Sequence, residues 1–174
     1  MTPARQTRAF RLAPMCGTIR TLTVVIVPLP LLLLALGIFG PRPVLPVLLA
    51  SATFTSALWV FIWCWLRPTR FEVGPDGLRL AWPLRQRLVK WDEIAGADVM
   101  SSRDFRTEYG RGARVGAGGL WGGFGLAMTK KGTLDLYTSR TDRFVLVRRR
   151  QGRTMLLSPE MPEQFVDAVR AMVG

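Results

Sequence analysis

The stretch VVIVPLPLLLLALGIF, residues 24–39, decides how this chain is organised. It lies in an uncharged run of 21 residues, 21–41, and an uncharged run of 24 residues, 43–66, follows after one arginine. As helices these runs would measure about 31 and 36 Å, whereas the hydrocarbon core of a membrane is about 30 Å thick. The sequence therefore predicts a hairpin of two transmembrane helices, at about 21–40 and 44–66.

Prolines interrupt this hairpin, which covers residues 21–66. Pro28, Pro30 and Pro46 would break helices in water, but in a membrane neighbouring helices and local backbone adjustments satisfy the freed carbonyls. Two alternatives stay open: a buried hairpin in a soluble protein, and a cleaved signal peptide, for which Leu36 has small neighbours at suitable places. A second long apolar run follows the first almost at once, which favours a hairpin that is retained.

Arginines set the expected orientation. Residues 1–20 form a basic N-terminal segment with four arginines and no acid, and Arg67 and Arg70 follow the second run, whereas the short connection holds only Arg42. Positive charge stays in the cytoplasm, so we expect a multi-pass protein of the cytoplasmic membrane with both termini inside. The cytoplasmic end of the second helix also carries an aromatic belt of three tryptophans, Trp59, Trp63 and Trp65.

Residues 68–174 are expected to form a cytoplasmic domain of short strands followed by one helix. The turn Pro75-Asp76-Gly77 precedes a strand of alternating apolar residues, and FVLV at 144–147 is apolar on both faces, as in a central strand. The period then becomes helical after Ser158-Pro159-Glu160, which combines a capping hydroxyl, a proline and an acid. The expected fold is a membrane-anchored α+β protein with antiparallel strands and a C-terminal amphipathic helix.

A family resemblance covers residues 70–174. It rests on GLWGGFGLAMTKKGTLDLYTSRTDRFVLVRRRQGRTMLLSPEMPEQFVDAVRAMV, with its aromatic and glycine segment, basic hairpin and Leu-Ser-Pro-Glu lead into the last helix, and on DGLRL and VKWDEI upstream. This succession resembles the bacterial pleckstrin-homology-like (PH-like) domains that are fused to membrane hairpins. The resemblance implies a seven-stranded, partly open antiparallel β-barrel capped by the C-terminal helix, at the bacterial inner membrane. Such domains are mostly adaptors.

The sequence contains no recognisable site for catalysis, a cofactor or a metal. It has no histidine, which removes the commonest general base and the commonest metal ligand. The spacings GxSxG, HExxH, CxxC and that of an EF-hand do not occur, and the two cysteines are isolated. We therefore expect a protein that is not an enzyme and that uses no cofactor.

The segment YGRGARVGAGGLWGGFG, residues 109–125, is rich in glycine but is not a nucleotide-binding loop. Its GxG pairs lack the third glycine of GxGxxG, and Lys130-Lys131-Gly132 has the wrong order for a Walker loop. We expect a long flexible loop, and two interpretations stay open: a sheet crossing where glycine permits close packing, or a loop that contacts the membrane or a partner. The candidate loop contacts are Arg111, Arg114, Trp121 and Phe124.

Basic residues exceed acidic residues in the domain. From Arg67 onward there are 19 Lys and Arg against 12 Asp and Glu. The candidate residues for binding an anionic surface are Arg148, Arg149, Arg150 and Arg153, with Arg85 and Arg87 in a second hairpin. Anionic phospholipid headgroups are one expected partner, at about 1 kcal/mol per basic residue near the surface. The alternative is that the surplus only continues the positive-inside pattern. Tethering to a membrane argues against nucleic acid.

These observations predict a membrane protein whose work is binding. Its PH-like domain would act at the cytoplasmic membrane surface as an adaptor for a protein, for anionic lipid or for other copies of the chain, and an exposed sheet edge would suit an added strand. The alternative function is an accessory subunit of a membrane transport or signalling complex. In that case the transmembrane hairpin would be the interface, and the small residues of ASATFTSA, 50–57, would pack against other helices.

Overall fold

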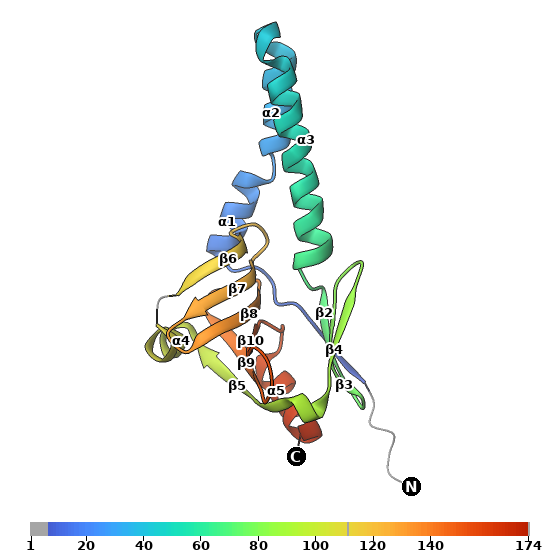
Figure 1. Cartoon of the computed structure of the whole chain (residues 1–174), viewed down its shortest axis with the longest axis vertical. Helices are drawn as coiled ribbons and strands as arrows, with labels where there is room; N and C mark the ends of the chain where they lie inside the picture. Colours follow the sequence, from blue (N-terminus) through green and yellow to red (C-terminus); the bar gives the residue numbers. More distant parts are fainter. Residues whose placement is uncertain (1–6, 111, 174) are drawn as a thin grey trace.

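The computed structural model describes residues 7–110 and 112–173 of the chain. A long helical hairpin stands on a β-rich domain (Figure 1). The hairpin consists of α1 (Gly17–Ile26), α2 (Leu29–Phe39), the 3-10 helix η1 (Arg42–Val44), α3 (Leu45–Phe61) and the π-helical turn η2 (Ile62–Leu66). The two arms of the hairpin lie side by side and enter the domain at separate places (Figure 1).

Proline determines the shape of the first helical span. The chain turns at Val27 and Pro28 between α1 and α2, because Pro28 has no N–H that could bond to the preceding turn. Pro30 then lies in the first turn of α2, and Pro46 lies in the first turn of α3. Backbone N–H groups have no partner within the helix at these positions, so a proline there removes no hydrogen bond of the helix. The continuous helix predicted over residues 21–40 is therefore two helices, and the first of them begins at Gly17.

Two helical spans are long and apolar enough to cross a membrane. They cover Gly17–Phe39 and Arg42–Leu66, with 23 and 25 residues. In the most apolar stretch of 18 residues of each span, only 17 % and 11 % is buried, so the domain leaves most of this apolar surface uncovered. Phe39 is 88 % exposed and Phe54 is 70 % exposed. This exposure is the opposite of what a core hairpin of a soluble protein requires.

The domain contains two β-sheets. The first has the order β1 (Arg8–Arg11), β2 (Arg70–Gly74), β3 (Gly77–Ala81) and β4 (Gln86–Val89). The second has the order β5-β9-β10-β8-β7-β6, with β5 (Ile94–Ser101), β6 (Ala113–Gly118), β7 (Gly123–Thr129), β8 (Gly132–Thr138), β9 (Arg143–Arg149) and β10 (Met155–Leu157). The helical elements of the domain are η3 (Trp91–Glu93), α4 (Ser102–Tyr109) and α5 (Pro162–Val173).

The predicted β-rich domain with a C-terminal helix is confirmed, but its strands differ from the prediction. Among the described residues the strands form two separate sheets rather than one barrel sheet, and β2 to β10 make nine strands after the hairpin rather than seven. One pair is parallel, with Leu156 of β10 opposite Leu136 of β8. The parallel pair arises because β10 inserts between β8 and β9 while running antiparallel to β9.

The second sheet is covered on both faces. On one face the first sheet and α5 share a core with it, to which β9 contributes Val145 and Val147. On the other face β9 contributes Phe144 and Leu146 to a smaller core, against which Phe105 of α4 packs. The prediction that residues 144–147 form a central strand, apolar on both faces, is therefore confirmed.

The basic N-terminal segment is part of the domain, which the sequence did not predict. β1 pairs antiparallel with β2, with Phe10 opposite Phe71. The Phe10 side chain is 5 % exposed and meets Phe165 of α5 edge-on, with ring centroids 5.3 Å apart. Further along, the Ala13 N–H donates to the Ser158 carbonyl at 2.8 Å. The segments before and after the hairpin therefore form one folded unit.

The C-terminal helix begins later than predicted. We expected its start at Ser158–Glu160, but α5 begins at Pro162. The Ser158 hydroxyl does not cap it; instead this hydroxyl accepts from the Ser139 N–H at 2.8 Å, and both serines are buried. The Ser139 hydroxyl in turn donates to the Ala13 carbonyl at 2.5 Å. The predicted capping residue thus joins the N-terminal segment to the second sheet.

Replacing Phe10 should destabilise the whole domain, although it lies outside the predicted domain boundary. F10A removes a buried ring from between the first sheet and α5, and we expect the free energy of unfolding to fall by about 3 kcal/mol. The matched control is R8A on the same strand, whose side chain is exposed. Thermal unfolding of the full-length protein in detergent measures both variants. Equal melting temperatures for F10A and R8A would contradict a structural role for β1.

Candidate functional site

The basic turn, which carries the candidates Arg150 and Arg153, lies at the end of β9 that points away from α1. The opposite end of β9 follows Thr141, whose hydroxyl lies 3.5 Å from the Cys16 sulfur at the start of α1. From there β9 runs through seven residues, about 20 Å at 3.4 Å per residue. The turn that carries Arg150 and Arg153 therefore lies at the end of β9 remote from the start of α1.

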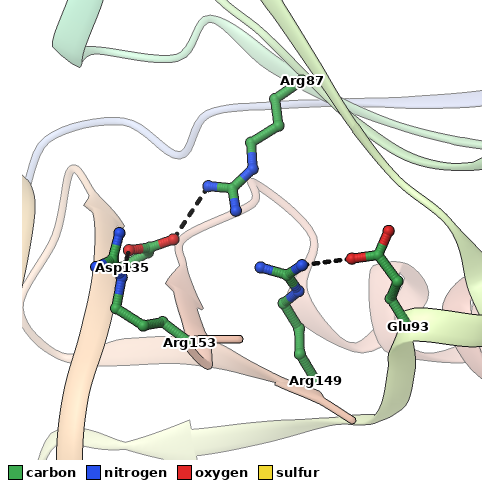
Figure 2. Close-up of polar contacts among 5 residues, drawn as sticks. All are labelled: Arg87, Glu93, Asp135, Arg149 and Arg153. Carbon is green, nitrogen blue, oxygen red and sulfur yellow. Dashed lines mark hydrogen bonds and ion pairs between the residues drawn. The ribbon is translucent and has the colours of Figure 1, made fainter. Parts of the chain in front are cut away.

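Two of the candidate arginines share a buried acid. Asp135 of β8 is 3 % exposed and lies between the sheets, where Arg87 of β4 and Arg153 reach its carboxylate at 3.0 and 2.7 Å (Figure 2). Burial alone would lower the pKa of Arg87, but the hydrogen bond and the charge of Asp135 raise that pKa above its ordinary value. The ion pair therefore connects the first sheet to the second.

Two further candidates are also paired. Arg149 of β9 is 13 % exposed and pairs with Glu93 of η3 (Figure 2). The hydrogen bond from Arg149 lowers the pKa of Glu93, so this carboxylate stays ionised well below neutral pH. Arg148 pairs with Asp98 of β5. All of these arginines have structural partners, and their binding to an anionic surface stays a prediction.

Arg85 and Arg150 are the two candidates without an ion pair in the described part of the chain. The Arg85 guanidinium lies 4.4 Å from the ring centroid of Trp82, which is a cation–π distance. The Arg150 side chain is exposed in the turn after β9. The six candidate arginines therefore do not form one unpaired basic surface.

The glycine-rich segment that we predicted as a loop is a β-hairpin. β6 and β7 pair along their whole length, with Gly116 opposite Gly125. These two glycines have φ of 138° and 125°, and a Cβ on Gly116 would lie 2.2 Å from the Phe124 carbonyl oxygen. Glycine is needed for this close approach of the strands, which agrees with the structural interpretation of the segment. Arg111 lies outside the described residues.

The tip of the β6–β7 hairpin lies against α1 (Figure 1). The Trp121 N–H donates to the Thr23 hydroxyl at 2.9 Å, and that hydroxyl donates to the Gly119 carbonyl at 3.3 Å. The Trp121 ring also meets Trp63 of η2 edge-on, with centroids 4.9 Å apart. Trp121 is therefore a contact to both arms of the helical hairpin. Phe124 is 1 % exposed in the core, so its predicted role as a loop contact is wrong.

A cavity of about 330 Å³ lies between α1, α4 and the second sheet, and we call it the α1 cavity. The sheet contributes apolar side chains from the smaller core, including Ala127, Leu136 and Phe144. Ile19 and Leu22 line it from α1. The polar part of the lining consists of threonines, glycine backbone and three arginines, Arg106, Arg114 and Arg140.

The α1 cavity is positively charged. No carboxylate of the described residues lines it. Arg140 is neutralised by Asp142, whose pKa is lowered by the hydrogen bond from Arg140. Arg106 and Arg114 are exposed and form no ion pair within residues 7–110 and 112–173. The same residues contain no group of three or more His, Cys, Asp or Glu that could hold a metal ion.

Sequence reasoning missed the helix that carries Arg106. α4 is capped by Ser101, whose hydroxyl accepts from the Asp104 N–H at 3.2 Å and donates to the Asp104 carboxylate at 2.7 Å. The spacing Ser-x-x-Asp before Phe105 was the available signal, because it is the pattern of a capping box.

The comparison with known families follows this geometry. The profile of the bacterial PH domain matches residues 69–173, more than half of the chain. The chain belongs to the bacterial PH domain family. Searches of the curated proteins and of the solved structures find no match. The match begins after the helical hairpin, so β1 completes the first sheet of the PH domain from outside the matched region.

Removing the buried acid of the PH domain should destabilise it. D135N breaks the ion pairs of Arg87 and Arg153, whose side chains are 38 % and 55 % exposed and can regain water. We therefore expect a loss of about 1 to 2 kcal/mol in the free energy of unfolding. Denaturant unfolding of the full-length protein measures it, with D76N in an exposed turn as the control. An unfolding midpoint for D135N equal to that of D76N would mean that the pair between the sheets contributes nothing.

Proposed function

We propose that this protein is a non-catalytic, multi-pass protein of the bacterial inner membrane whose hairpin holds the PH domain at the cytoplasmic surface as a binding adaptor. The observation that carries this proposal is the double connection between the domain and the hairpin. β1 enters the first sheet from before α1, and the β6–β7 tip bonds to Thr23 within α1. A domain attached in this way is held close to the helices rather than on a free linker.

The arginine distribution supports one side of the membrane for the domain. Because β1 pairs with β2, the segments before and after the hairpin meet in one domain. Residues 1–20 carry four arginines and no acid, and the short turn between the arms carries only Arg42. This distribution supports a domain that lies in the cytoplasm. Trp63 and Trp121 meet where the domain joins the hairpin. Tryptophans are typical of the membrane–water interface, which supports placing this part of the protein there.

Two ligand classes are supported by observations. The unpaired arginines of the α1 cavity support an anionic phospholipid headgroup. The outer edge of β6 supports a protein partner, because β6 is the last strand of the second sheet and Val115 is 52 % exposed on it. An edge of this kind accepts an extended peptide through main-chain hydrogen bonds.

Reporter fusions in bacterial cells test the proposed arrangement. A fluorescent protein fused after Gly174 should fluoresce, whereas alkaline phosphatase at the same place should be inactive, because the PH domain lies in the cytoplasm. The control is the same pair of reporters inserted at Gly40, which should give the opposite result. Active phosphatase at Gly174, or release of the protein from membranes by alkaline carbonate, would contradict the proposal.

A further inference from the structure

The α1 cavity lies at the level where lipid headgroups would surround the proposed hairpin, and in this respect the inference rests on the proposed function. Thr18, Ile19 and Leu22 line the cavity from the first two turns of the span Gly17–Phe39. A helix of that length measures about 34 Å, against about 30 Å for the hydrocarbon core. In the proposed arrangement the first turn of α1, at the end of this span next to the PH domain, would lie in the headgroup region.

We propose that the α1 cavity binds the anionic headgroup of a phospholipid from the adjoining leaflet, and that Arg106 and Arg114 pair with its phosphate. These two arginines come from α4 and β6, and both line the cavity. A guanidinium group donates two parallel hydrogen bonds to phosphate oxygens, and a phosphate can receive such pairs from two arginines. No carboxylate of the described residues lines the cavity, and Asp142 is paired with Arg140.

Glycine leaves the room that a headgroup needs. A Cβ on Gly123 would lie 3.9 Å from Nη1 of Arg114 and 3.3 Å from Leu136, so the Arg114 guanidinium lies over bare backbone beside the apolar lining. The cavity is lined by further glycines, Gly110, Gly112, Gly119 and Gly122. Its volume of about 330 Å³ is within the range of ligand pockets. The glycine-rich hairpin thus shapes the cavity as well as the strand pairing.

The apolar lining favours a lipid over a soluble anion. Leu22 is 44 % exposed and lies on α1, and Phe105 and Ile19 also line the cavity. A free phosphate would leave Leu22 facing water, whereas the glycerol and upper acyl carbons of a lipid would cover it. The charges of Arg148, Arg149 and Arg153 are instead matched by Asp98, Glu93 and Asp135.

Native mass spectrometry of the full-length protein in a neutral detergent tests this site. We expect the wild-type chain to bind phosphatidylglycerol at least about tenfold more tightly than phosphatidylcholine. R106Q/R114Q should lose this preference. K90Q/R103Q removes the same charge from exposed residues outside the cavity, and it should keep the preference. Thermal unfolding of both variants checks that each remains folded.

The outcomes separate this inference from the proposed function. A preference that survives in R106Q/R114Q, or that is lost in K90Q/R103Q, would overturn the α1 cavity as the site. Displacement of phosphatidylglycerol by inorganic phosphate or glycerol phosphate at equal concentration would mean that the cavity takes a soluble anion. Equal binding of both lipids by the wild-type chain would overturn the inference, while the reporter fusions would still decide the topology independently.

Discussion

Burial of Phe10 between the first sheet and α5 is the contact on which the rest of the structure depends. β1 precedes the helical hairpin and β2 follows it, so their pairing closes the chain into a ring through the hairpin. Five residues separate β1 from α1, and one of them, Ala13, bonds to Ser139 and Ser158, so α1 begins beside the second sheet. Without this contact the PH domain would be attached through the short segment between η2 and β2, the bonds of Ala13, and the β6–β7 tip.

The position of α1 in turn determines which contacts the glycine-rich hairpin makes and where the α1 cavity lies. The β6–β7 tip reaches Thr23 because α1 starts beside the second sheet, and Trp121 then meets Trp63 on the other arm. The cavity is the part of the sheet face that α4 leaves uncovered next to α1. Its two unpaired arginines come from the consecutive elements α4 and β6, whereas Ile19 and Leu22 line it from α1, far away in the sequence, so the site exists only in the assembled fold.

Much of the architecture could be predicted from local patterns. Uncharged runs gave the hairpin nearly to its boundaries, and the Leu-Ser-Pro-Glu lead and strand patterns indicated the PH domain. The errors concern contacts between distant segments. Phe10 lies between arginines, without the apolar alternation that predicts a buried strand. The glycines of β6 and β7 likewise interrupt the alternation that would have predicted their pairing. The basic turn resembled a free surface because Asp135, Glu93 and Asp98 lie on other strands or turns. The Arg106 helix alone had a local signal, its Ser101 cap.

Disulfide cross-linking in native membranes tests most directly whether the PH domain is docked on the hairpin. In a C16S/C64S background, T23C/W121C should cross-link within one chain under mild oxidation, because the Trp121 N–H lies 2.9 Å from the Thr23 hydroxyl. T23C/V115C, which places the second thiol on the exposed part of β6, should remain reduced. Intramolecular cross-linking of T23C/W121C alone is the predicted result. Equal cross-linking of both pairs, or of neither, would contradict the docked arrangement.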